Sequence, residues 1–270
     1  MKLLQYIAIL ILVLAFTAVA NAQDSAGNTS ETTELSSAKP KPQVLDHEKW
    51  QFQLTPYLWI AGVKGQAGIG NLTTNVDAAL TDDNVDLNFG FMGTFEARKK
   101  RFVILTDLQY SNLGTDRATP GPLFSSASAD FKTFVFDPEV GYRIVQNPEK
   151  GAFVDVLGGI RYWHLKTDLT FNSGLASSVS ASRSRDWVDG VAGIRGRAHL
   201  SPRLFVTGKA DIGGGGSDFS YQLFGGGGYL VGSRYALIAG WRHLSVNYNK
   251  DGFLFDNALS GPVLGFGIKF

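Results

Sequence analysis

The chain has no cysteine among its 270 residues, so no disulfide bond can stabilise its fold in any compartment. Its formal net charge is only +1, which argues against a nucleic-acid-binding surface and against a strongly acidic or basic tail. Beyond residue 22 it also lacks any long uninterrupted apolar run, so we expect no membrane-spanning helix. The stability of the protein must therefore come from a different architecture.

The amino terminus has the pattern of a secretory signal peptide, which we predict to cover residues 1–22. Lys2 supplies the basic start, residues 3–20 are almost wholly apolar, and Ala20-Asn21-Ala22 matches a cleavage site with small residues. A membrane anchor is the alternative, and the cleavage site and the polar segment after it disfavour it. Residues 23–48 are rich in Ser, Thr, Glu, Lys and Pro, which predicts a disordered periplasmic lead-in. The folded part is expected to be 49–270.

The carboxyl terminus alternates strictly between apolar and small or polar residues. Leu264, Phe266, Ile268 and Phe270 fall on one face of a predicted strand. An apolar face that ends in an aromatic terminus is typical of the last strand of a bacterial outer-membrane barrel, whereas an edge strand of a soluble sandwich is the alternative. We expect Phe270 to be part of the signal that the barrel-assembly machinery reads.

The same alternation recurs along the chain and predicts an all-β, antiparallel, up-and-down transmembrane barrel of about ten strands. The predicted strands are 50–60, 88–99, 102–110, 131–145, 152–166, 186–200, 203–213, 218–231, 234–248 and 253–270. An eight-stranded barrel is the alternative. Long connections at 64–87, 114–130 and 167–185 alternate with short turns, which places both termini in the periplasm and the long loops outside.

On nearly every predicted strand the charged residues fall on the face opposite the apolar one. The exceptions, His164, Lys166 and His243, lie toward the outer strand ends. A charge at the lipid midplane costs roughly 2–4 kcal/mol, so these side chains are expected to point into the lumen. The set is Glu96, Arg98, Asp107, Asp137, Glu139, Arg143, Asp155, Arg161, Asp189, Arg195, Arg197, Lys209, Asp211, Arg242 and Lys269. Acidic and basic members nearly balance, which favours internal ion pairs that seal the lumen over a selective pore with an excess of one sign. We expect Arg161, Arg195 and Arg197 to pair with Asp155 and Asp189.

Evidence for catalysis is weak. The parity of His164 and His243 directs both rings toward lipid or the interface, and the neighbouring Asp168 makes only an isolated pair with His164. We therefore expect no catalytic residue, no cofactor and no metal site. The acidic segment 75–87 is interpreted as a solvated loop, with a divalent-cation or lipopolysaccharide site as the alternative.

Three segments resemble uncharacterised outer-membrane β-barrel proteins of Gram-negative bacteria, broadly the OmpA/OmpW-like set of small barrels. These segments are Thr55–Gly62, Gly159–Trp163 and Asp186–Arg197, and the resemblance covers 50–270. It implies a fold and an outer-membrane location but no substrate, since barrels of this size serve as adhesins, stability elements, small-solute pores and enzymes.

The leading hypothesis is a non-enzymatic barrel with a largely sealed polar lumen and a structural or surface-interaction role. A narrow pore for small solutes is the runner-up, and an outer-membrane hydrolase is third. The expected partners are outer-membrane lipid, lipopolysaccharide and the barrel-assembly machinery, with no nucleic acid. We expect the barrel to be a monomer.

Overall fold

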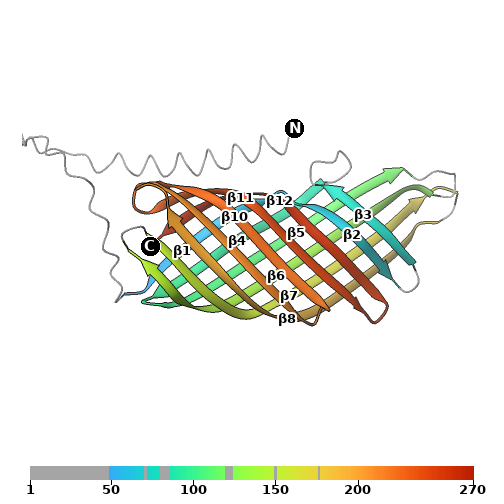
Figure 1. Cartoon of the computed structure of the whole chain (residues 1–270). Coiled ribbons are helices and arrows are strands. Elements are labelled where there is room, and N and C mark those ends of the chain that lie inside the picture. Colours follow the sequence, from blue (N-terminus) through green and yellow to red (C-terminus); the bar gives the residue numbers. More distant parts are fainter. Residues whose placement is uncertain (1–48, 70–71, 80–85, 119–123, 149–150, 176) are drawn as a thin grey trace, which may run out of the picture. The chain divides into compact units, whose positions relative to one another are not determined.

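A computed structural model shows a single antiparallel sheet that closes on itself (Figure 1). The structure describes residues 49–69, 72–79, 86–118, 124–148, 151–175 and 177–270. The predicted signal peptide and lead-in, 1–48, lie outside these ranges. Within the described ranges, no helix is long and apolar enough to cross a membrane.

Twelve strand segments make up the sheet. They are β1 (Gln51–Trp59), β2 (Gly62–Ile69), β3 (Leu72–Ala79), β4 (Asp86–Lys99), β5 (Phe102–Ala118), β6 (Phe124–Asn147), β7 (Ala152–Ser173), β8 (Val179–His199), β9 (Leu204–Gly215), β10 (Phe219–Val231), β11 (Tyr235–Lys250) and β12 (Phe253–Lys269). Their order is β1-β4-β5-β6-β7-β8-β9-β10-β11-β12-β2-β3, and the pairing of β1 with β12 closes the barrel.

The twelve segments build ten wall positions. β1 and β2 are consecutive pieces of one position, because both pair with β12, β1 along 263–269 and β2 along 253–260. β4 pairs with β1 and β3 pairs with β2, so these two segments share the next position. The prediction of a ten-stranded barrel is confirmed, and the eight-stranded alternative is wrong.

The first wall strand is interrupted at Ile60 and Ala61, and a glycine opposite the break permits it. A Cβ atom at Gly261 of β12 would collide with the carbonyl of Ile60 and press on the backbone of Ala61. The amide of Ile60 donates to the carbonyl oxygen of Pro262 at 3.0 Å, so the ladder continues across the break. The close backbone approach therefore requires glycine at this position.

Strands reach much farther from the short-turn end than the sequence predicts. Most of the expected loops 114–130 and 167–185 are strand, because β5 runs to Ala118, β7 to Ser173, and β8 begins at Val179. β7 has 22 residues, whereas about 9–11 tilted residues suffice to cross a bilayer. The β5–β6 and β7–β8 hairpins thus extend beyond the membrane. Their outer parts consist mainly of polar and small residues with few apolar ones, such as Leu169 and Phe171, so the apolar alternation is weak there.

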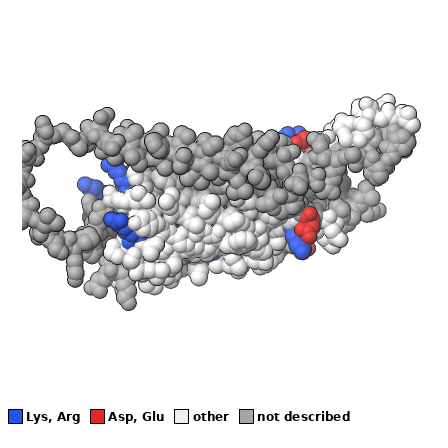
Figure 2. All heavy atoms as spheres, turned by 90° about the horizontal axis from the view of Figure 1, so that it is seen from above, with Lys and Arg blue, Asp and Glu red and all other residues white. Residues whose placement is uncertain are grey.

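The wall is apolar outside and charged inside, the reverse of a soluble protein. Large apolar side chains are exposed on the outer face, among them Val140, Ile160, Ile212 and Leu237, while Asp155 is fully buried inside. On the face in Figure 2, charged side chains gather toward the two ends and the described middle carries none. An uncharged band of this kind is the lipid-facing surface of a transmembrane barrel.

Aromatic rings and short turns mark one end of the band. Phe52 stacks on Phe270 with ring centroids 5.9 Å apart and on Phe95 at 6.1 Å. Short turns join β4 to β5, β6 to β7, β8 to β9 and β10 to β11 at this same end. Because outer-membrane barrels keep their short turns in the periplasm, we call it the periplasmic end and the opposite one the outer end.

Candidate functional site in the barrel lumen

The lumen contains three layers of side chains. The mid-lumen network consists of Asp107, Asp137, Glu139, Arg161, Lys209, Asp211 and Arg242. The basal cluster, nearer the periplasmic end, consists of Glu96, Arg98, Arg143, Asp155, Arg195, Arg197 and Lys269. The outer aromatic cluster consists of Trp59, Trp163, Trp187, Tyr248 and Phe253.

Arg161 of β7 is the centre of the mid-lumen network. Its side chain is 0% exposed, and Nη2 lies 2.8 Å from Asp137 Oδ2 and 2.8 Å from Asp211 Oδ1. Lys209 Nζ lies 2.7 Å from Glu139 Oε2 and 3.3 Å from Asp211 Oδ2. A buried charge is tolerated only when it is paired, and here each of these charges has a partner.

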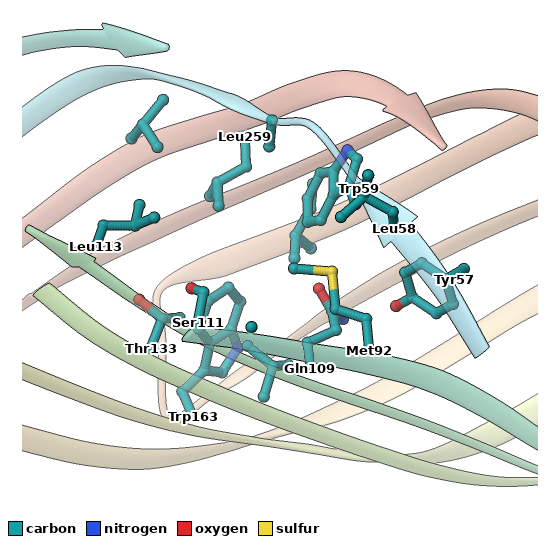
Figure 3. A pocket seen from close by; sticks show the side chains of 15 residues that line it. Tyr57, Leu58, Trp59, Met92, Gln109, Ser111, Leu113, Thr133, Trp163 and Leu259 are labelled. Atoms are coloured by element: carbon teal, nitrogen blue, oxygen red, sulfur yellow. The ribbon is translucent and has the colours of Figure 1, made fainter. Parts of the chain in front are cut away.

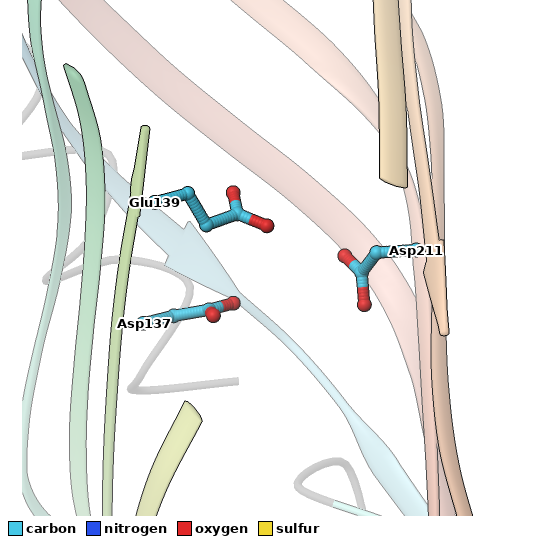
Figure 4. Close-up of side chains that lie close together, drawn as sticks. All are labelled: Asp137, Glu139 and Asp211. Carbon is cyan, nitrogen blue, oxygen red and sulfur yellow. The ribbon is translucent and has the colours of Figure 1, made fainter. Parts of the chain in front are cut away.

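Three buried carboxylates of this network have the spacing of a metal site. Oxygen atoms of Asp137, Glu139 and Asp211 lie within 4.8 Å of one another, and Figure 4 shows the three side chains converging. Lys209 contacts all three carboxylates, and Arg161 contacts two of them. The chain's own cations therefore offset most of the negative charge of these three carboxylates.

A hydrogen-bonded bridge crosses the lumen at Tyr57. Its hydroxyl donates to Asp107 Oδ1 at 2.7 Å and accepts from Arg242 Nη1 at 2.7 Å. Arg242 Nη1 also lies 2.8 Å from Asp107 Oδ2. Since β12, β1 and β4 separate β11 from β5 along the wall, the Arg242–Asp107 pair joins well-separated sides of the barrel.

Two cavities lie within the lumen, and Tyr57 lines both. The outer cavity, about 70 Å³, is mainly apolar and is bounded by side chains such as Trp59, Met92 and Trp163 (Figure 3). The periplasmic cavity, about 150 Å³, is bounded by charged side chains that include Arg195 and Arg197. The Tyr57–Asp107–Arg242 bridge thus separates an apolar space from a charged one.

A second cross-lumen contact lies in the basal cluster. Arg195 of β8 places Nη1 2.9 Å from Glu96 Oε2 of β4, across a wall arc that contains β5, β6 and β7. Arg195 also contacts Asp155 Oδ2 at 3.0 Å, and Arg143 Nε donates to Asp155 Oδ1 at 2.7 Å. These four residues form a continuous chain of ion pairs.

Asp189 does not pair with arginine as the sequence analysis expected. Its carboxylate accepts from the Ser217 amide at 2.6 Å, from Ser217 Oγ at 2.8 Å and from Ser220 Oγ at 3.3 Å. Arg195 does pair with Asp155 as expected, at 3.0 Å, and it also reaches Glu96 across the lumen. Arg161 pairs instead with Asp137 of β6 and Asp211 of β9. The expectation was incomplete because it considered only strands β7 and β8.

Sequence reasoning did not single out the outer aromatic cluster. Trp163 stacks on Trp187 with ring centroids 5.4 Å apart, and Trp187 stacks on Tyr248 at 4.4 Å. A signal was present, since Trp163 has the parity of Arg161 and Trp187 has that of Asp189. Tyr57, Gln222, Ser217 and Ser220 were likewise not singled out as members of the lumen network.

The histidines predicted to face outward do so. His164 Nδ1 lies 2.6 Å from Asp186 Oδ1, and the hydroxyl of Tyr162 donates to the same oxygen at 2.5 Å, with both partners of the ion pair partly exposed. His243 Nε2 is hydrogen-bonded to the hydroxyl of Tyr221 at 3.1 Å. Asp168, the neighbour of His164 in sequence, instead belongs to a polar cluster farther out.

That outer polar cluster ties the projecting strands together. Asp168 accepts from Ser182 Oγ at 2.5 Å and lies 3.2 Å from Lys166 Nζ and 3.4 Å from Lys132 Nζ. The hydrogen bond from Ser182 and the two ammonium groups lower the pKa of this carboxyl below its ordinary value.

The segment 75–87, interpreted above as a loop, forms part of strands β3 and β4 where it is described.

Comparison with known proteins supports the fold. The chain is similar to the outer membrane protease OmpT from Escherichia coli, with a TM-score of 0.55 and 9% sequence identity, over 82% of this chain and 96% of that one. It also matches the translocator domain of the autotransporter NalP from Neisseria meningitidis, with a TM-score of 0.44 and 16% identity, over 84% of this chain and 91% of that one. The attachment invasion locus protein Ail of Yersinia pestis matches with a TM-score of 0.39 and 14% identity, over 83% and 99%.

No protein-family model and no curated protein sequence matches the chain. The fold is that of the bacterial outer-membrane β-barrels. At identities this low the likeness concerns the fold alone, and function must be argued from the lumen and the rim.

Proposed function

We propose that the protein is a non-enzymatic outer-membrane barrel with a closed lumen, whose projecting hairpins form a surface for interaction outside the cell. The Tyr57–Asp107–Arg242 bridge carries this proposal, because it lies between the two lumenal cavities and is built from short, buried contacts. The Arg195–Glu96 contact also crosses the lumen, at a level nearer the periplasmic end.

Two of the described histidines support a role other than hydrolysis, and a third, His199, stacks on Phe205 at the periplasmic end. His164 and His243 lie on the outward face, where their partners are Asp186, Tyr162 and Tyr221. A hydrolase requires a base that is positioned against a nucleophile or an activated water, in a site that holds the substrate. The carboxylates inside the barrel are already engaged, Asp189 with serine donors and those of the mid-lumen network and basal cluster with arginine or lysine.

The outer hairpins present polar side chains that could make contacts at the cell surface. They carry polar side chains linked across strands, such as Asp168 with Ser182 and Asn172 with Ser126. Polar surfaces stiffened by strand pairing suit lipopolysaccharide or a macromolecular partner outside the cell. We propose lipopolysaccharide as the first such partner, in agreement with the sequence analysis.

The test is a conductance recording from refolded protein in a planar bilayer. The wild type is expected to show no steady current. A triple variant, Tyr57→Ala, Asp107→Ala and Arg242→Ala, removes an acid together with a base, so it leaves no member of this ion pair without its partner and should conduct. Tyr57→Phe keeps the ring as a barrier and should remain silent. A steady current through the wild type would favour the narrow pore for small solutes.

A further inference from the structure

The charges of the lumen are unevenly distributed along its length. The mid-lumen network has four carboxylates, Asp107, Asp137, Glu139 and Asp211, against three cations, Arg161, Lys209 and Arg242. The basal cluster has only Glu96 and Asp155 against Arg98, Arg143, Arg195, Arg197 and Lys269. A marked excess of positive charge therefore lies near the periplasmic end.

Strand register places these cations close to one level of the barrel. Arg98 lies opposite Gln51, Lys269 lies opposite Gln53, and Arg197 lies opposite Phe153, all within a few residues of the short turns or the chain end. Glu96 attracts Arg197 while Arg195, Arg98 and Arg143 repel it, and Lys269 is repelled by Arg197 and Arg98 and attracted by Glu96. The cations are thus near neighbours in space although they come from different strands.

The two basal carboxylates are already occupied. Arg195 and Arg143 hold Asp155, and Arg195 holds Glu96. Within the part of the chain that the structure describes, Arg98, Arg197 and Lys269 are in no ion pair. These three cations share the field of Glu96 with Arg195, and the basal cluster keeps an excess of positive charge.

Of these three cations, Arg197 most clearly requires a further hydrogen-bond acceptor. Its Nε is buried and has no hydrogen-bond acceptor among the described residues. Its guanidinium carbon lies 4.4 Å from the centroid of the Phe205 ring, so the group is held by stacking on an apolar face. A buried, oriented donor with no acceptor is costly unless a ligand or water satisfies it.

The periplasmic cavity offers the space for such a ligand. It measures about 150 Å³, and its charged lining residues are Arg195, Arg197, Lys209 and Arg242 against Glu96 and Asp107. The side chains of Gln53, Thr55 and Thr207 also line it. An engineered protein cavity of roughly 150 Å³ accommodates benzene, so a tetrahedral oxyanion fits a space of this size. The lining combines excess positive charge with neutral hydrogen-bond donors.

We propose that the basal cluster binds a phosphate-class oxyanion, with Arg197 as its principal contact and Lys269 and Arg98 supplying further positive charge. Guanidinium groups suit this anion because their planar array of donors matches its oxygens. Free phosphate from the periplasm and the headgroup phosphate of an anionic lipid share this chemistry. The site lies on the periplasmic side of the Tyr57 bridge, so anion binding does not depend on whether the lumen conducts.

The experiment is calorimetric titration of inorganic phosphate into the full refolded barrel in a zwitterionic detergent, at constant ionic strength set with chloride. Wild-type protein is expected to bind saturably. Arg197→Gln should weaken binding by roughly tenfold or more, equivalent to about 1.4 kcal/mol. Arg203→Gln is the matched control, since Arg203 is exposed and donates to Tyr229. Lys269→Gln provides a second test, with weaker binding expected.

Folding does not confound this test. Arg197→Gln removes one of several like charges, so the urea midpoint of this variant should be at or above that of the wild type. If the midpoint is lower, the phosphate titration of Lys269→Gln is used in its place. Repeating the titration in bilayer discs of phosphatidylcholine and of phosphatidylglycerol separates the two sources of phosphate. Loss of phosphate binding only with phosphatidylglycerol would identify the lipid headgroup, whereas equal binding in both would identify the free anion. No saturable binding in either, or equal binding by wild type and Arg197→Gln, would overturn the proposal.

Discussion

Arg161 shows how a single side chain organises the interior. It is fully buried, it lies in a strand whose outer face meets lipid, and it contacts carboxylates from β6 and β9. A fully buried arginine would destabilise an apolar core. In a polar lumen it takes the structural place of a packed apolar side chain, because its charge is matched on two sides.

Arg161→Gln should destabilise the refolded barrel by about 3–5 kcal/mol, because Asp137 and Asp211 would remain buried with too little positive charge. A urea titration read by the heat-modifiable band on a gel measures this loss. Arg203→Gln, at an exposed turn, should unfold at the wild-type midpoint. If Arg161→Gln also unfolds there, water hydrates the lumen and the closed interior is disproved.

Phe270 has two separable roles at the residue scale. It exchanges backbone hydrogen bonds with Phe52 at 3.2 and 3.1 Å, which closes the barrel, and we propose that it also carries the assembly signal. Deleting Phe270 should lower the folded fraction in cells, where the assembly machinery acts, more than it lowers refolding of purified protein into detergent. Equal losses in both settings would assign Phe270 to barrel closure alone.

At the scale of elements, the β9–β10 turn is held by a buried carboxylate on a neighbouring strand. Asp189 of β8 accepts hydrogen bonds from Ser217 and Ser220, which flank the turn on its β10 side. The turn also packs closely against β8, where a Cβ atom at Gly216 would collide with the backbone of Val188. Contacts with β8 therefore fix the position of the β9–β10 turn.

Asp189→Ala should loosen this turn, because buried donors of Ser217 and Ser220 would lose their acceptor. A loss of about 1–3 kcal/mol is expected in a urea titration. Hydrogen exchange localised to residues 216–220 would identify the turn as the affected element. Uniform exchange across β8 would contradict a local role, and Asp189→Asn, which keeps an acceptor oxygen, should lie between the two proteins.

At the scale of the whole molecule, the two ends of the barrel differ in length and charge. The periplasmic end has short turns and the basal cluster, while the outer end has hairpins that continue well past the lipid-facing band. This asymmetry fixes the expected orientation in the membrane. It also places the proposed interaction surface and the proposed anion site on opposite sides.

Protease added to intact cells should cut in the segment between β5 and β6 or the segment between β7 and β8, and should spare the segment 148–151 between β6 and β7. Fragment masses from the membrane fraction give the sites. Permeabilised cells are the control, in which 148–151 becomes accessible. Cleavage at 148–151 alone in intact cells would invert the orientation.

The sequence by itself determined the class of fold, because side chains in a strand alternate with a strict period of two and the parity of each residue can be read locally. That parity was enough to place Asp137, Arg161 and Arg242 inside and to count ten wall positions. It did not show that β5–β8 continue beyond the membrane, since the apolar alternation is weak in their outer halves. Strand pairing across the hairpin, rather than burial, holds those parts.

Only the tertiary structure decided which charges meet. Arg195 pairs with Glu96, 99 residues away, and Arg242 bonds to Tyr57, 185 residues away, because both contacts cross a lumen whose width and stagger depend on the whole closed sheet. The numbers of acidic and basic lumenal residues nearly balance in the sequence. In the structure they are unevenly placed, with most carboxylates at mid-lumen and an excess of cations near the periplasmic end. The face on which a side chain lies follows from the local sequence of its strand. Which side chains meet across the lumen depends on how the whole sheet closes.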